Sequence, residues 1–250
     1  MSDPARGGRL AGSARADRPA SAARVVRIAS DWHLGPHSPA SHGRLALAFL
    51  EAALADGAEV ILNGDVFDDL FAGPAALRAH PDVVDAMNGL AARGLLRRTA
   101  GNHDPDLPLQ RVELEVAGLG RVLVAHGHAV DPVNASPIGR LVDGISRRFG
   151  RFAVVRGAAW LAEAATRALA GRAMVRIFRE RCLAVVVREG YSLGVFGHVH
   201  VAHLEIGDRY ANAGAMGERL EYLELAPGGP RLASLGPEDA EGSTLRRLRG

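Results

Sequence analysis

The stretch EVILNGDVFDD, residues 59–69, joins a short apolar run to a cluster of three acids. An apolar run of this length followed by glycine predicts a buried strand that ends close to Gly64. Carboxylates beside a buried strand are unfavourable unless hydrogen bonds or a cation compensate their charge. The acids of this stretch therefore predict a compensating partner elsewhere in the chain.

The segments around this strand alternate between strand and helix patterns. RVVRIAS (24–30) and GLLRRTA (94–100) predict two further strands, and SHGRLALAFLEAALADG (41–57) predicts a helix. Residues 74–93 are also helical in character, with a break near Pro81. Strands that alternate with helices predict a sheet buried between helices, as in an α/β fold.

The second half of the chain predicts a hairpin, a basic helical segment and a return to strands. We expect the hairpin across GLG in residues 111–127 and further strands from YSLGVFGHVH onward. The predicted domain organisation is a disordered tail at 1–23, a folded domain at 24–225 with a helical basic insertion at 138–189, and a loop or tail at 226–250.

Composition narrows the class of protein. The chain has 250 residues, is 48% hydrophobic and carries a net charge of only +2, and all of its 30 basic residues are Arg. Its single cysteine, Cys182, excludes a disulfide framework and a zinc site built from Cys, and it fits a reducing compartment. There is no apolar run of the roughly 18–20 residues that a membrane span needs, and no secretory h-region. We therefore expect a cytoplasmic protein.

Side chains that can bind a metal follow five of the predicted strands. They are Asp31 and His33 in SDWHLG, Asp65 and Asp68 in GDVFDD, Asn102 and His103 in GNHD, His126 in AHGH, and His198 and His200 in GHVH. The carboxyl ends of strands in an open α/β sheet share one crevice. Alternation along an extended strand end would point the two members of Asp31/His33, and of His198/His200, to the same face.

The ligand chemistry predicts two cations rather than one. Oxygen and imidazole ligands without thiolate suit Mn, Fe or Zn. The set is larger than one ion needs, and a carboxylate that bridges two ions about 3.5–4 Å apart would use it fully, as in sites for phosphoryl transfer. A metal pair would also compensate the acids of GDVFDD.

SDWHLG, GDVFDD, GNHD, AHGH and GHVH, in this order, resemble the five motifs of the calcineurin-like metallophosphoesterases. The resemblance spans residues 31–200 and implies a four-layer α-β-β-α sandwich with a helical cap insertion. It implies hydrolysis of a phosphoester or diphosphate by a hydroxide that bridges two divalent ions, most simply Mn²⁺. The implied ligands of the first ion are Asp31, His33, Asp65 and His200, and those of the second are Asp65, Asn102, His126 and His198. By the same resemblance, His103 protonates the leaving oxygen and Asp68 orients His103.

Within that superfamily the chain is most similar to the UDP-2,3-diacylglucosamine hydrolases of lipid A synthesis. The insertion at 138–189 carries eleven Arg against four acids, with Arg172, Arg176 and Arg179 on one helical face. A basic amphipathic helix is typical of an element that binds an anionic ligand or a membrane surface. This branch implies a lipid-linked substrate and a peripheral position at the inner membrane. The chain departs from it at His103, where the branch often has Arg, and at His128, where it has Asp.

Other functions share the same motifs. A nuclease, a cyclic-nucleotide phosphodiesterase and a nucleotide or protein phosphatase are alternatives within the superfamily, and a nuclease would spread its basic residues along a groove. A scaffold that does not catalyse is a further alternative, but it predicts missing ligands, and this chain has them all. We therefore expect a phosphorylated small molecule or a lipid-linked substrate ahead of nucleic acid, with a nuclease left as an alternative.

Overall fold

The computed structural model describes residues 24–132, 153–205 and 207–240, with only the backbone described for residues 70–71 and 153–170. In chain order the helices are α1 (Ala40–Asp56), α2 (Asp69–Ala72), α3 (Pro74–Ala79), α4 (Pro81–Ala92), the 3₁₀ helix η1 (His128–Val130) and α6 (Ala153–Arg188). The strands are β1 (Val26–Ala29), β2 (Glu59–Asn63), β3 (Leu96–Thr99), β4 (Arg111–Val116), β5 (Gly120–Ala125), β6 (Leu193–Phe196), β7 (His203–Leu204), β8 (Tyr210–Asn212), β9 (Leu220–Ala226) and β10 (Gly229–Leu235).

The first sheet has the order β10-β9-β1-β2-β3. Strands β1, β2 and β3 are parallel, and helices α1 and α4 lie in the connections between them. Strand β9 returns from the far end of the chain to pair antiparallel with β1. The predicted αβ alternation of the first hundred residues is therefore confirmed, and it places the ends of β1, β2 and β3 at one edge.

The second sheet has the order β4-β5-β6-β8-β7. The predicted hairpin is the antiparallel pair β4 and β5, and β6 then pairs parallel with β5. A parallel neighbour needs a crossover connection, and α6 lies in the connection between β5 and β6. The ends of β5 and β6 consequently point in one direction.

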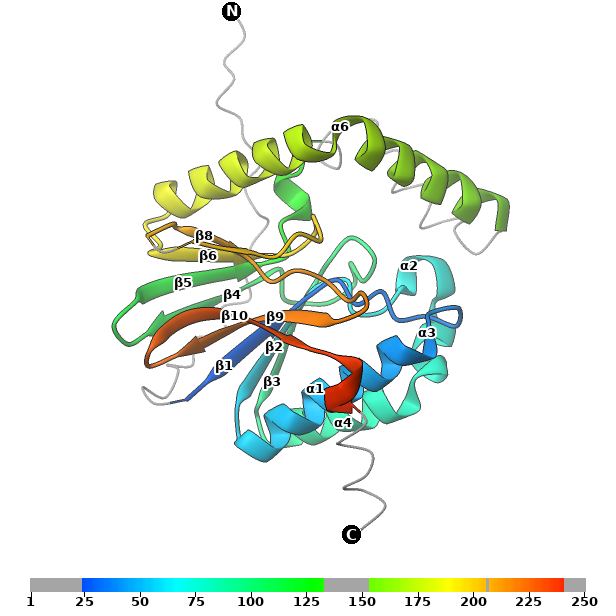
Figure 1. Ribbon diagram of the computed structural model, residues 1–250, viewed down its shortest axis with the longest axis horizontal. Helices are drawn as coiled ribbons and strands as arrows, with labels where there is room; N and C mark the ends of the chain where they lie inside the picture. The colour runs from blue at the N-terminus through cyan, green and yellow to red at the C-terminus, as the bar shows by residue number, and fades with distance from the viewer. Residues whose placement is uncertain (1–23, 133–152, 206, 241–250) are drawn as a thin grey trace, which may run out of the picture.

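The two sheets pack face to face and helices cover both outer faces, as Figure 1 shows. Ile28, Ile61, Val124 and Leu223 belong to the apolar cluster between the sheets. Helices α1 and α4 cover the first sheet, whereas Phe178, on the C-terminal half of α6, packs against the second. The fold is an α/β sandwich with four layers, as the resemblance of the motifs implied.

The C-terminal segment corrects one prediction. Residues 226–250 were expected to form a loop or tail, but residues 229–235 form strand β10, which pairs with β9 along its whole length. Ala226 pairs with Gly229, so Pro227 and Gly228 form a two-residue turn, and Gly229 and Pro230 already belong to β10. Ala240 is buried against the core of the first sheet.

Some predictions lie outside the described residues. These are the N-terminal tail at 1–23, the first part of the insertion at 138–152 and the end of the chain at 241–250. Among the helices that the structure describes, none combines the length and the apolar character required to span a bilayer.

Candidate metal centre

The predicted ligands converge where the two sheets end. Asp31, Asp65 and Asn102 follow β1, β2 and β3 of the first sheet, and His126 and His198 follow β5 and β6 of the second. Strands β1, β2 and β3 are parallel to one another, and β5 and β6 are parallel in the second sheet. The carboxyl ends of these strands therefore open onto one site. This grouping is what the sequence predicted.

The backbone in these loops is not extended. The non-glycine residues with positive φ in the described part of the chain are five of the predicted ligands: Asp31 (57°), His33 (46°), Asp65 (53°), His198 (72°) and His200 (56°). The expectation that strand alternation orients each pair is therefore wrong, because left-handed turns orient them instead. Each such residue costs on the order of 1–3 kcal/mol, and such conformations gather at functional sites.

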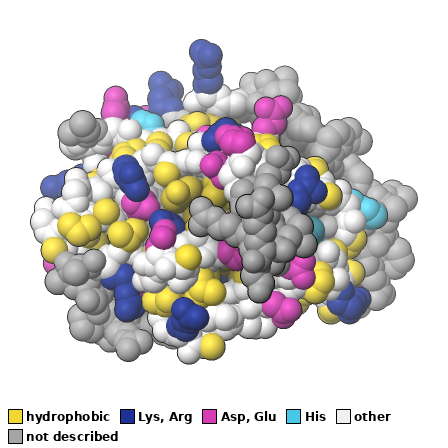
Figure 2. All heavy atoms as spheres, turned by 60° about the horizontal axis from the view of Figure 1, so that its bottom comes forward, with side chains coloured by type: hydrophobic (Ala, Val, Ile, Leu, Met, Phe, Trp, Pro, Cys, Tyr) yellow, Lys and Arg dark blue, Asp and Glu magenta, His cyan; other side chains and the backbone are white. Residues whose placement is uncertain are grey.

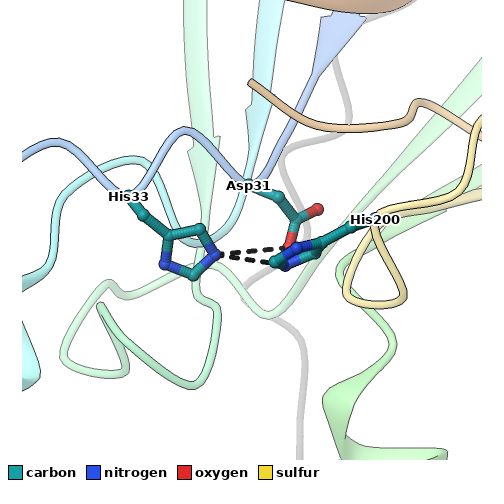
Figure 3. A group of neighbouring side chains, drawn as sticks. All are labelled: Asp31, His33 and His200. Carbon is teal, nitrogen blue, oxygen red and sulfur yellow. Dashed lines mark hydrogen bonds and ion pairs between the residues drawn. The ribbon is translucent and has the colours of Figure 1, made fainter. Parts of the chain in front are cut away.

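The first cluster consists of Asp31, His33 and His200, which point toward one another from two loops (Figure 3). The Nε2 atom of His200 lies 3.2 Å from the Oδ1 atom of Asp31 and 3.2 Å from the Nε2 atom of His33. Asp65 borders the cluster, with its Oδ2 atom 3.9 Å from His33 Nε2. These atoms are close enough to bind a single ion.

The second cluster shares Asp65 with the first. The Oδ2 atom of Asp65 lies 3.2 Å from His126 Nε2. The Oδ1 atom of Asn102 lies 3.3 Å from His126 Nε2 and 3.0 Å from His198 Nδ1. Asp65 is thus placed between two groups of ligands.

Converging acceptor atoms suggest that the second cluster fits a cation. His126 Nδ1 must donate its proton to the carbonyl oxygen of Asn63, 2.9 Å away, because a carbonyl oxygen only accepts. In the neutral ring the lone pair of His126 Nε2 then faces Asp65 Oδ2 and Asn102 Oδ1, which are acceptors too. Acceptors that face one another at this range repel unless a positive charge lies between them.

The first cluster contains a buried carboxylate oxygen that accepts no hydrogen bond. Asp31 Oδ1 is buried and accepts no hydrogen bond, although a buried carboxylate oxygen without a partner is costly. A divalent ion at each cluster would satisfy these oxygens and rings, and the donor set of carboxylate, amide oxygen and imidazole suits Mn, Fe or Zn.

The electrostatics of the site are those of a charged cluster in a buried place. Burial disfavours the imidazolium of His126, but the carboxylates of Asp65 and Asp31 outweigh it and raise its pKa to about 10. Burial likewise opposes ionisation of both carboxyls, yet the neighbouring rings, His126 first, lower the pKa of each. Burial, followed by the charge of His103, lowers the pKa of His33 to about 4. A proton on His126 thus supplies positive charge at the place where an ion would supply it.

His103 and Asp68 lie beside the ligands. His103 Nδ1 donates to Asp68 Oδ1 at 2.9 Å, and the backbone N–H of His103 donates to Asp65 Oδ1 at 2.8 Å. The ring of His103 stands edge-on to that of His33, with 4.6 Å between centroids. The structure therefore brings all nine predicted residues together, and their individual roles stay predictions.

Residues outside the predicted set hold the loops in place. Asp104 accepts from the backbone N–H groups of Asp65 (2.9 Å) and Gly101 (2.8 Å), as expected of a loop cap. Asn212 donates to the carbonyl oxygen of Gly197 at 2.7 Å, which fixes the loop that carries His198. No sequence motif marks Asn212, since a polar residue far along the chain gives no sign of which loop it meets.

Two motif glycines are required by close approach. A Cβ atom on Gly101 would overlap Asp65 Oδ1 and lie 2.5 Å from the Asp65 backbone nitrogen. A Cβ atom on Gly197 would lie 2.6 Å from Asp31 Oδ2. In GNHD and GHVH, therefore, the glycine makes room for a ligand from another loop.

Arg179 corrects part of the prediction for the basic helix. Its guanidinium lies 2.5 Å from Asp208 Oδ2 and 5.9 Å from the centroid of the Tyr210 ring. It therefore anchors α6 to the hairpin of β7 and β8, whereas Arg172 and Arg176 stay exposed. The side chains His203, Glu205 and Asp208 of this hairpin are also close enough to hold an ion, but Arg179 already neutralises Asp208.

Comparison with known proteins gives only distant likenesses. No protein-family model and no curated protein matches the chain. Among solved structures, an uncharacterised Streptococcus pneumoniae protein described as a predicted phosphoesterase is 14% identical, with 86% of this chain and 100% of that chain covered and a TM-score of 0.42.

Two other solved structures are similar at the same level. A mutant of Vps29 from Entamoeba histolytica is 14% identical, with 84% of this chain and 98% of that chain covered and a TM-score of 0.45. A cold-active protein-tyrosine phosphatase of a psychrophilic Shewanella species is 13% identical, with 87% and 79% covered and a TM-score of 0.43. At these scores the likenesses carry no conclusion about function.

Proposed function

We propose that this protein is a phosphoesterase that depends on two divalent metal ions. The observation that carries the proposal is the pair of ligand clusters joined at Asp65, with five of the ligands in strained left-handed conformations. Strained, charged side chains that gather in a buried site are typical of functional sites.

The ligands divide between the ions as their distances suggest. Asp31, His33 and His200 would hold the first ion, and Asn102, His126 and His198 the second, with Asp65 between them. Mn²⁺ is our first choice, with Fe or Zn compatible with the same donors. When bound, such a pair lowers the pKa of water and neutralises charge on phosphoryl oxygens.

His103 supplies the proton that the reaction needs. Its Nδ1–H is held by Asp68, so the ring orientation is fixed and Nε2 would exchange a proton with substrate. A histidine titrates near neutral pH and can protonate a leaving oxygen. The carboxylate of Asp68 favours the charged ring that donates this proton.

We further propose a lipid-linked diphosphate of the UDP-2,3-diacylglucosamine kind as the substrate. Arg172 and Arg176 on α6 are exposed, and Val201, directly after the ligand His200, is 48% exposed. A cationic helix, and an exposed apolar side chain directly after a predicted ligand, suit a diphosphate that carries acyl chains.

Nucleic acid is the alternative that the charge pattern of one face argues against. On the face shown in Figure 2, Arg and acidic side chains are interspersed across the described part rather than gathered by sign. Binding to a phosphate backbone would instead favour a continuous basic surface.

A substrate screen tests the proposal. The full chain, freed of metal by chelation and supplied with Mn²⁺, is assayed on a chromogenic phosphodiester, on nucleotides, on DNA and on UDP-2,3-diacylglucosamine, with Asp65→Asn as the inactive control. Turnover that needs metal and is fastest on the lipid-linked diphosphate supports both proposals. Turnover of DNA or nucleotides alone would support the proposed metal-dependent phosphoesterase activity but contradict the proposed lipid-linked substrate.

A further inference from the structure

Asp131 is a buried carboxylate beside the site that none of the sequence motifs includes. It follows the 3₁₀ helix η1, which turns the chain back after His126 so that Asp131 lies against the second cluster. Its Oδ2 atom is 3.2 Å from His198 Nε2, and its side chain is only 11% exposed. Burial first, and then the charge of Asp131, raises the pKa of the Cys182 thiol on α6.

Both ring nitrogens of His198 face oxygen atoms. Nε2 faces the carboxylate of Asp131, and Nδ1 faces the amide oxygen of Asn102 at 3.0 Å. A neutral imidazole carries one proton, and a hydrogen bond to a carboxylate is stronger than one to an amide oxygen. The proton therefore belongs on Nε2, and the lone pair of Nδ1 points into the second cluster.

The two imidazoles of this cluster thus present different nitrogens. His126 uses Nε2 because its Nδ1 donates to the carbonyl oxygen of Asn63. His198 would use Nδ1, because the carboxylate of Asp131 lies beside its Nε2 and favours the proton there. The ring of Phe178, 5.6 Å from that of His198 between centroids, packs on it from α6 and limits its rotation.

We propose that Asp131 is the positioning residue that selects Nδ1 of His198 as a ligand of the second metal ion. The inference rests on the proposed dinuclear site. A carboxylate that accepts the second N–H of a ligating imidazole fixes its tautomer and raises its basicity, and its loss lowers metal affinity about 10–100-fold.

Asp208 offers a matched control. It too is 11% exposed, its Oδ2 atom also lies 3.2 Å from the Nε2 of a histidine (His203), and it also faces α6. It lies on the β7–β8 hairpin outside the two ligand clusters, so Asp208→Ala removes a similar carboxylate–histidine contact, and the ion pair with Arg179 as well, without touching the predicted ligands.

The test is a calorimetric titration of the metal-free full chain with Zn²⁺, joined to nitrogen NMR of the histidine rings in the Zn-loaded protein. The wild type should bind two ions and carry the His198 proton on Nε2. Asp131→Ala should weaken one of the two sites about 10–100-fold and leave the other unchanged. Asp131→Asn, which keeps an acceptor oxygen but not the charge, should weaken the same site less, and Asp208→Ala should weaken neither.

Each of the other outcomes would contradict one part of the proposal. Unchanged affinity and proton position in Asp131→Ala, or an equal loss in Asp208→Ala, would overturn the role of Asp131 and leave the dinuclear site standing. A wild type that binds fewer than two ions would overturn the proposed function itself, before any variant is compared. If Asp131→Ala does not fold, Asp131→Asn decides, since wild-type affinity in that variant would equally overturn the inference.

Discussion

Backbone strain and ligand position coincide at single residues. A left-handed conformation at Asp31 or His200 is unfavourable, but the loops that contain them are tied by hydrogen bonds. The backbone N–H of His198 donates to Asp31 Oδ2 at 2.9 Å, and that of His103 donates to Asp65 Oδ1 at 2.8 Å. These ties use one oxygen of each carboxylate and leave the other facing the histidine rings.

His103 is bound differently from the ligands, and this gives a first prediction. Its ring is held by Asp68, so we expect His103→Ala to lower turnover by about 10²–10⁴-fold while both ions stay bound. His200→Ala should instead lose metal, because His200 contacts Asp31 in the first cluster. Steady-state kinetics with elemental analysis of each variant would separate the two effects.

The leaving group supplies the control for His103. A nitrophenolate leaves without a proton, so the loss in His103→Ala should be smaller on that substrate than on an alkyl phosphodiester. Loss of metal in His103→Ala, or equal losses on both substrates, would show that His103 is a ligand or a binding group.

Close approach at Gly101 gives a second prediction at this scale. Because a Cβ atom there overlaps Asp65, Gly101→Ala should displace the carboxylate shared by both clusters. We expect weaker Mn²⁺ binding and a loss of about 1–3 kcal/mol in the free energy of unfolding. Chemical denaturation and metal titration measure these effects. Gly228→Ala, where nothing lies within 4 Å of the added atom, is the matched control, and equal effects in the two variants would contradict the steric argument.

Among the elements, α6 combines two functions along its described C-terminal half. Phe178 and Cys182 are buried against the second sheet, and Arg179 joins the helix to Asp208. Arg172 and Arg176 face solvent. Helical spacing alone placed all three arginines on one face, and it could not show that a hairpin more than twenty residues later covers one of them.

This division predicts different effects for arginines on one helix. Arg172→Gln with Arg176→Gln should weaken binding to vesicles that contain anionic lipid and leave turnover of a small chromogenic phosphodiester unchanged. Arg179→Gln should instead lower thermal stability, because it breaks an ion pair with a largely buried carboxylate and a contact with Tyr210. Vesicle sedimentation and thermal melts distinguish the two. Equal vesicle binding by the double variant and the wild type would exclude a membrane role for these two residues.

Across the whole molecule, the sequence predicted what local patterns encode. Apolar runs ending in SDWHLG or GDVFDD predict strands followed by ligands, and the common direction of parallel strands predicts that the ligands meet. The pairing of strands that are far apart in the sequence leaves no local signal. Nothing in RLEYLEL indicates that β9 pairs with β1 of the first sheet, or that β10 follows it. The role of Asp131 has no local sequence signal, because its contact with His198 joins residues 67 positions apart that meet only in the folded chain.

Both sheets contribute ligands, so metal binding should stabilise the entire sandwich. An ion that binds only the native state adds RT ln(1 + [L]/Kd) to the free energy of unfolding, or about 2.7 kcal/mol per site at 100 times Kd. For a chain of this size that corresponds to a rise of roughly 5–10 °C in the melting temperature per site. Thermal melts of the chelator-treated protein with and without Mn²⁺ measure it. Asp65→Asn should abolish most of the rise, since Asp65 lies at both clusters, whereas His103→Ala should keep it. A melting temperature that does not change when Mn²⁺ is added, or a full rise in Asp65→Asn, would show that the two clusters do not bind a pair of ions.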